Sequence, residues 1–190
     1  THLNRDLVQF PANVTNRTEA IAHRIATAGI YRKVADNQVK ALRFILSGSH
    51  EDMLQLESEG RLEEWCHSTM QWLYTTFGKA NVVAATLHAD EETPHIHATV
   101  VPIVTGERRK ARQEAENGKR KYKTKKNKIR LCADDLLTPK KLEEYQTSYA
   151  EQMRPFGLSR GVQGSEAKHR TNMEYYKELL KETKQKQLEE

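Results

Sequence analysis

The sequence predicts an α+β domain with a mainly antiparallel β-sheet that is flanked by helices. Stretches with apolar residues at helical spacing alternate with β-rich runs along the chain. Near the middle, two β-rich runs at residues 81–88 and 95–103 are separated by only six residues, which include Pro94. So short a connection is typical of an antiparallel hairpin.

The composition is that of one globular domain. A chain of 190 residues with 37% hydrophobic and 30% charged residues can bury a hydrophobic core and present a charged, solvated surface. It contains no run of eighteen apolar residues, and its N-terminus lacks the basic head and apolar stretch of a signal peptide. Two cysteines, Cys66 and Cys132, are too few for a disulfide framework, so a cytoplasmic location is expected.

The first elements follow from local pattern. Residues 2–10 alternate weakly and are interpreted as a strand or strand end. Residues 16–29 predict a helix, because Ile21 and Ile25 share a face and Gly29 stands at the stop position. Residues 39–48 predict a strand that Gly48 ends.

A long helix is expected over residues 50–77. Gly60 is a candidate interruption and Gly78 a terminator of this helix. Its apolar positions are Leu54, Leu62, Trp65, Trp72 and Leu73.

The clearest helix is predicted at residues 137–157. Thr138 can cap it and Pro139 suits its first turn, while Pro155 and Gly157 end it. A last helix begins near Thr171, where Glu174 could complete a capping box. We therefore expect one main domain over residues 1–165 and a C-terminal helix over 166–190 that leads into a further region.

The stretch HADEETPHIH at residues 88–97 predicts a metal centre. His95 and His97 are two apart on a strand, so they project to one face about 7 Å apart at their roots. If the hairpin closes, His88 at the end of the neighbouring strand meets His95 across the pair. Three imidazoles then form a tripod with open coordination positions, which suits Zn, Mn, Fe, Co or Ni.

The acids of the same stretch have several candidate roles. Asp90 and Glu91 could bind the metal, hold a histidine N–H, or act as a base. The alternatives are a structural zinc, which the lack of a nearby cysteine disfavours, and histidines that merely occupy a strand.

Residues 107–130 form a basic block. They hold twelve Lys or Arg against three Glu, a local charge of +9, so the remaining residues sum to −4. Such a block predicts salt-dependent contact with nucleic acid, although a solvated loop remains the alternative. Tyr122 could stack on an unpaired base. The candidate DNA-binding residues of the block are Arg108, Arg109, Lys110, Arg112, Lys119, Arg120, Lys121, Tyr122 and Lys123.

These motifs together resemble a known family. The pair His95-Ile96-His97 is similar to the HUH endonucleases, which nick and rejoin single-stranded DNA. The pattern His88-x-Asp90-Glu91-x-x-Pro94-His95-x-His97 resembles the third motif of plasmid mobilisation relaxases of the MobV, or Pre/Mob, family. The resemblance extends to THLNR at residues 1–5, VVPIVTGERRKA at 100–111 and GSEAKH at 164–169.

The resemblance implies an HUH relaxase-like fold and activity. A divalent metal, Mn or Mg, would polarise the scissile phosphate, and a nucleophile would keep the 5′ end on the protein. The expected partners are single-stranded and hairpin DNA of a plasmid transfer origin, in the bacterial cytoplasm, with a homodimer through a C-terminal region beyond Glu190. The resemblance carries Glu91 over as a supporting acid and Asp90 as the orienter of a histidine. It places His2, Asn4 and Arg5 near the active site or the DNA backbone.

One family feature is not found in the sequence. The first family motif contains a His and an Arg, supplies the nucleophile and would precede Thr1. The first strand and the nucleophile are therefore expected to be missing. The tyrosines, including Tyr145 and Tyr149, are better explained by helix packing or the basic block. Two rival functions therefore stay open, a DNA-hairpin-binding module without cleavage and a small-molecule metalloenzyme.

Overall fold

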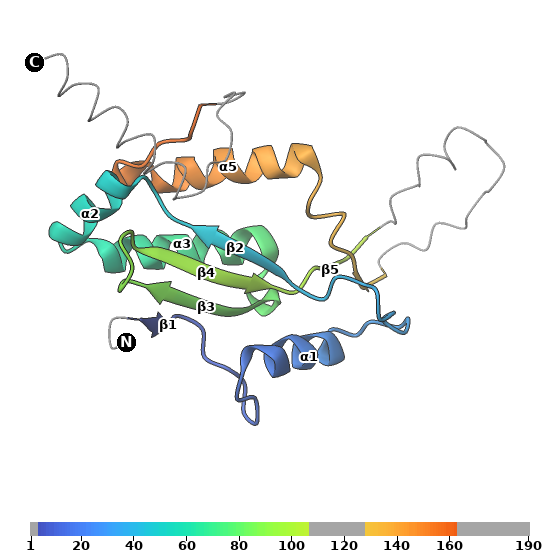
Figure 1. Cartoon of the computed structure of the whole chain (residues 1–190). Helices are drawn as coiled ribbons and strands as arrows, with labels where there is room; N and C mark the ends of the chain where they lie inside the picture. The colour runs from blue at the N-terminus through green and yellow to red at the C-terminus, as the bar shows by residue number, and fades with distance from the viewer. Residues whose placement is uncertain (1–3, 107–127, 163–190) are drawn as a thin grey trace, which may run out of the picture. The chain divides into compact units, whose positions relative to one another are not determined.

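The predicted antiparallel sheet is present in the computed structural model, which describes residues 4–106 and 128–162 (Figure 1). Four strands pair in the order β1-β3-β4-β2, and every pairing is antiparallel. Their bounds are β1 Arg5–Asp6, β2 Leu42–Leu46, β3 Val82–His88 and β4 His95–Val100. The α+β class is thus confirmed, with the predicted hairpin at the centre of the sheet.

The hairpin register decides which side chains share a face. His88 lies opposite His95, and the next pair on that face is Thr86 opposite His97. On β4, Ile96 is fully buried on the other face. Alternation along two β-branched strands therefore separates a histidine face from a core face.

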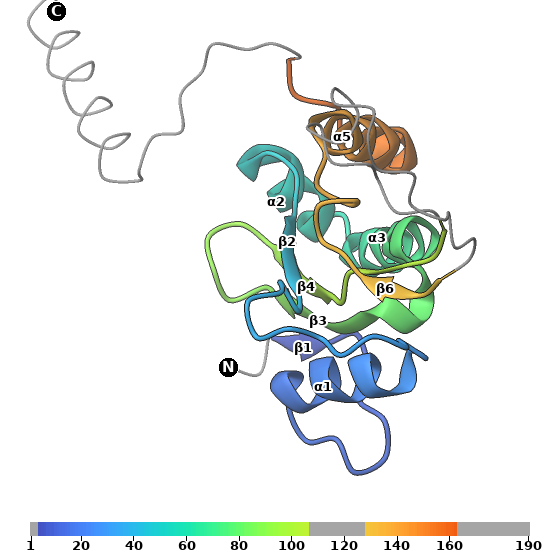
Figure 2. The same cartoon turned by 90° about the vertical axis from the view of Figure 1, so that its right-hand side faces the viewer.

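Helices cover the core face. These are α2 (His50–Ser58), α3 (Leu62–Phe77) and α5 (Pro139–Met153), and in both views α3 and α5 lie on the same side of the sheet (Figures 1 and 2). The largest apolar cluster joins them to the sheet and includes Trp65, Leu73, Ile96 and Met153. This burial is the main stabilising contribution, at about 25 cal/mol per Å² of apolar surface.

A second, smaller cluster lies under α1 (Arg17–Thr27). Ala20 lies within this helix and Ala28 directly follows it. Both pack with Val83, Val101 and Ile103. The helix begins as predicted, because the Asn16 side chain accepts a hydrogen bond from the Glu19 amide. It covers one end of the histidine face and leaves the end with the histidines partly exposed.

Three details differ from the expectation or refine it. The long helix is divided at Gly60, whose φ of +69° is the left-handed conformation that glycine adopts easily. The first strand is only two residues long. The short strand β5 (Ile103–Val104) precedes the basic block, and β6 (Arg130–Leu131) begins at its last residue. The two strands pair with each other and form a separate two-stranded sheet.

The remaining elements are short. They are the 3₁₀ turns η1 (Lys79–Asn81) and η2 (Arg154–Phe156). Of the helices that the structure describes, none is long and apolar enough to cross a membrane. The predicted helix at 166–190, most of the basic block and His2 lie outside the described residues, so those expectations stay predictions.

Candidate metal centre

Three histidine rings gather on one face at the closed end of the hairpin. The ring centroids of His88 and His95 are 5.1 Å apart, those of His88 and His97 4.7 Å, and those of His95 and His97 4.9 Å. The predicted juxtaposition of His88 with His95 is confirmed. It follows from the register, because the two residues are a direct cross-strand pair.

Glu91 brings a carboxylate to the cluster. Its Oε1 lies 3.3 Å from His88 Nδ1 and its Oε2 lies 3.9 Å from His95 Nε2. Ligand atoms of His88, Glu91 and His95 all lie within 4.8 Å of one another, a spacing that fits a shared cation. The side chain of His88 is 28% exposed, that of Glu91 59% and that of His95 13%. A ligand can therefore reach the cluster from solvent on the side of Glu91.

A backbone carbonyl orients His95. Nδ1 of its ring lies 2.8 Å from the carbonyl oxygen of Thr93. A carbonyl only accepts, so Nδ1 donates and the lone pair of the neutral ring is left on Nε2, the atom beside Glu91. A metal-binding histidine is commonly held in this way by a second hydrogen bond. The residues therefore fit a divalent cation on their own chemistry.

The third histidine is held differently. His97 Nδ1 lies 3.2 Å from Nη2 of Arg43 on β2, and the guanidinium can only donate. His97 therefore keeps its lone pair on Nδ1 toward Arg43. Burial is the largest cause that lowers the pKa of His97, and the other two histidines and Arg43 lower it further. A neutral ring is the form that can bind a metal.

The loop that carries Glu91 is anchored at both ends. The Asn4 amide oxygen accepts a hydrogen bond from the Ala89 amide at 3.1 Å. At the other end, the Ser47 hydroxyl donates to the Pro94 carbonyl at 2.8 Å, and His50 Nδ1 pairs with the Thr93 hydroxyl. These contacts hold the loop in place. Asn4 is one of the residues that the family resemblance singled out, whereas nothing in the sequence around Ser47 and His50 indicates their contacts.

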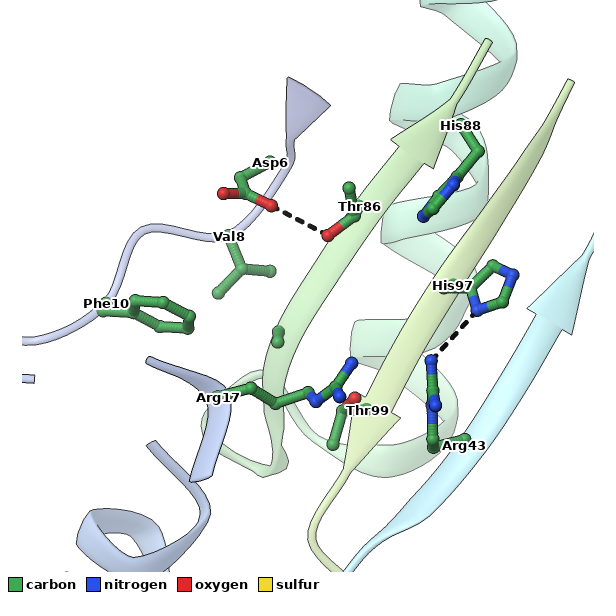
Figure 3. A pocket seen from close by; sticks show the side chains of 10 residues that line it. Asp6, Val8, Phe10, Arg17, Arg43, Thr86, His88, His97 and Thr99 are labelled. Atoms are coloured by element: carbon green, nitrogen blue, oxygen red, sulfur yellow. Dashed lines mark hydrogen bonds between the residues drawn. The ribbon is translucent and has the colours of Figure 1, made fainter. Parts of the chain in front are cut away.

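The other expected site residues lie in different places. Asp90 lies in the exposed part of the loop, and its role as an orienter stays a prediction. Arg5 forms an ion pair with Glu63 of α3 at 2.6 Å, which raises the pKa of Arg5. Its neighbour Asp6 accepts a hydrogen bond from Thr86 on the histidine face (Figure 3).

Two helix tyrosines have the packing role expected of them. Tyr145 and Tyr149 of α5 contact Trp72 of α3 edge to face, with ring centroids 6.2 and 5.1 Å apart. Burial raises the pKa of Tyr149 to about 12. Both phenols lie in the helical layer that covers the core face, so the described structure gives them no part in the histidine centre.

Arginines of the histidine face were missed by sequence reasoning. A hollow of about 280 Å³ adjoins His88 and His97 and is also lined by Arg17 of α1 and Arg43 of β2 (Figure 3). The two arginines are far apart in the sequence, and no motif links them. Only their placement on one face could have indicated them.

The comparisons with known proteins agree on one family. Residues 1–177 match the family described as plasmid recombination enzyme. A "65 kDa protein" of Zymomonas mobilis subsp. mobilis is 35% identical over 146 residues, which are 76% of this chain and 21% of that protein. A plasmid recombination enzyme of Bacillus thuringiensis is 30% identical over 88% of this chain and 31% of its own length. The chain thus spans less than a third of these two relatives.

Solved structures share the fold. The relaxase domain of MobM, in a Mn-bound crystal structure with 22-nucleotide plasmid oriT DNA, superposes with a TM-score of 0.69 and 22% identity over 94% of this chain and 81% of that one. A second structure of that domain, with 26-nucleotide oriT DNA, gives a TM-score of 0.67 and 21% identity over 90% of this chain and 86% of that one. At such identity the likeness shows the fold.

Proposed function

The chain belongs to the plasmid recombination enzyme family, and we propose that its histidine centre is the metal site of a relaxase that nicks and rejoins single-stranded DNA at a plasmid transfer origin. The observation that carries the proposal is the joint position of His88, Glu91 and His95, with ligand atoms within 4.8 Å of one another. The Mn-bound, oriT-bound state of the MobM domain supports the same interpretation.

We propose a divalent cation, Mn or Mg, as the cofactor. His88, Glu91 and His95 would hold it, and His97 would complete the predicted set of three histidines. When bound, such a cation polarises a phosphate oxygen and stabilises the charge that develops on it. The carbonyl of Thr93 keeps the His95 lone pair on Nε2, so the ring is prepared for binding.

The proposed reaction is a phosphoryl transfer. A protein nucleophile bonds to phosphorus while the bond from phosphorus to the 3′ oxygen breaks. The nucleophile gives up one proton, and the leaving 3′ oxygen takes up one proton and becomes a hydroxyl. The 5′ end stays covalently on the protein, and the reverse reaction reseals the strand. The role of this chain's described residues is to bind and orient the phosphate at the histidines.

Metal binding tests the centre directly. We expect Mn²⁺ affinity, measured by titration, to fall at least tenfold in His95→Ala and in Glu91→Gln, because each variant removes one proposed ligand. Glu92→Gln is the matched control, since Glu92 is the next residue of the same loop and lies outside the cluster. Equal affinities in Glu91→Gln and Glu92→Gln would refute the assignment of Glu91.

Activity tests the reaction. With Mn²⁺ and a labelled transfer-origin oligonucleotide, the full-length protein should give a shortened strand and a covalent adduct that survives denaturant. His95→Ala should abolish both products, whereas His67→Ala on the exposed surface of α3 should retain them. Persistent nicking by His95→Ala would count decisively against the histidine centre as the catalyst.

A further inference from the structure

A hollow on the histidine face extends from the candidate metal centre toward α1. It holds about 280 Å³ and is lined at one end by His88 and His97 and at the other by Arg17 (Figure 3). The segment after β1 forms its outer wall with Val8 and Phe10. The hollow is continuous with the centre, so a chain-like ligand at the histidines would run into it.

The hollow is electropositive. Arg17 and Arg43 line it, and Asp6 is the one carboxylate among its described lining residues. Asp6 already accepts a hydrogen bond from the Thr86 hydroxyl at 2.8 Å. No ion pair among the described residues engages either arginine. Two guanidinium groups without a carboxylate partner fit an anionic ligand.

The two arginines reach the hollow from different elements. Figure 3 shows the Arg17 side chain extending across β3 toward Thr99, while the Arg43 side chain rises from β2 to the His97 ring. In the sheet register Arg43 lies opposite Thr99, two residues along β4 from His97. That step is about 7 Å along the backbone of β4, and the Arg43 side chain spans it, because its Nη2 lies 3.2 Å from His97 Nδ1.

The hydrogen bond of Arg43 links this hollow to the metal centre. Arg43 donates to the lone pair on His97 Nδ1. A cation on that atom would take the lone pair, and a cation on Nε2 would leave a proton on Nδ1. In both cases the bond from Arg43 ends, so its guanidinium becomes free to turn toward the hollow.

We propose that this hollow is a phosphate subsite for single-stranded DNA, in which Arg17 and Arg43 hold the phosphodiester adjoining the one at the histidines. The assignment rests on the proposed function, because it takes the histidine centre as the place of the first phosphate. The apolar wall of Val8 and Phe10 would then contact the sugar or base between the two phosphates. Arg43 is thus a residue that positions the strand and that metal binding releases.

Binding of a fluorescent oligothymidylate in Mn²⁺ over a range of salt tests the subsite. For Arg17→Gln and for Arg43→Gln we expect affinity about tenfold lower, and a plot of log affinity against log salt less steep by about 0.7 for each phosphate that is no longer neutralised. The matched control is Arg154→Gln, an exposed arginine of η2 that does not line the hollow. Wild-type behaviour is expected of it.

Two further measurements separate this inference from the proposed function. Mn²⁺ affinity should not fall in either arginine variant, and it should rise in Arg43→Gln, which removes a competitor for the His97 lone pair. An oligothymidylate with a neutral methylphosphonate backbone should bind the wild type and the variants equally weakly.

The outcomes distinguish the two proposals. If both variants bind oligothymidylate as tightly as Arg154→Gln while Mn²⁺ still binds, the subsite is refuted and the metal centre stands. If both arginine variants bind DNA more weakly than the wild type but the wild type does not bind Mn²⁺, the proposed metal centre is refuted and the phosphate subsite stands.

Discussion

His95 and His97 are chemically alike but are prepared for different tasks by their hydrogen-bond partners. The Thr93 carbonyl makes Nδ1 of His95 a donor, whereas the Arg43 guanidinium makes Nδ1 of His97 an acceptor. Alternation along a strand predicts that both rings share a face, but it contains no information on these partners. The loop and a neighbouring strand supply them.

Cys66 provides a prediction at the same scale. The residue is 2% exposed, and burial, the largest cause, raises the pKa of Cys66 to about 11. The folded pKa lies above the ordinary value of 9.0, so this contribution to stability is present below pH 9 and disappears as pH rises toward 11. The free energy of unfolding should therefore fall more steeply in the wild type than in Cys66→Ala over that range, by at most about 1.4 kcal/mol per pH unit.

Urea unfolding at pH 8, 9 and 10 measures this difference. The control is Met70→Ala, which removes a buried side chain of the same helix that does not titrate and should keep the wild-type pH dependence. Parallel curves for the wild type and Cys66→Ala would contradict the expected titration.

At the scale of elements, helix ends follow the sequence closely. Thr138 was expected to cap the helix after residue 137, and its hydroxyl accepts a hydrogen bond from the Lys141 amide at 3.2 Å, with Pro139 in the first turn. Both signals act within four residues, so local chemistry is sufficient to determine them. By contrast, β1 has two residues and exists through its pairing with β3.

Removal of the α5 cap has a predictable cost. Thr138→Ala should lower the free energy of unfolding by about 1 kcal/mol, because an amide of the first turn is deprived of its acceptor. In the matched variant Thr147→Ala, the same change inside the helix should be neutral or slightly stabilising, since alanine is the better helix former. Denaturant titration of both variants checks the pair, and equal destabilisation would contradict the capping role.

At the scale of the whole molecule, charge is segregated. The chain carries +5, while residues 107–130 alone carry +9. In the structure β5 and β6 bracket this block and pair with each other at its two ends. These two strands form a separate small sheet, and β5 follows the histidine strand β4 after only two residues. The block therefore begins close to the histidine strand along the chain, and a common nucleic-acid ligand is the expected consequence.

Neutralising part of the block tests this expectation. Changing Lys119, Arg120, Lys121 and Lys123 to Gln should weaken oligothymidylate binding, and the slope against log salt should become less steep by about 0.7 for each phosphate that the variant leaves unneutralised. A variant with Gln at Lys33, Lys40, Lys140 and Lys141 has the same net charge and serves as the control. If the slope changes equally in both variants, general attraction and not a dedicated contact explains the binding.

Local sequence was sufficient to specify the hairpin, the helix caps and the meeting of His88 with His95, because each depends on residues that are close along the chain or follow strand alternation. It also indicated the family, through motifs of the same local kind. The strand order, the ion pair that turns Arg5 toward α3, and the convergence of Arg17 and Arg43 beside His97 became apparent only in the folded chain. These features join residues far apart in sequence, and their geometry is set by packing of the whole sheet against its helices.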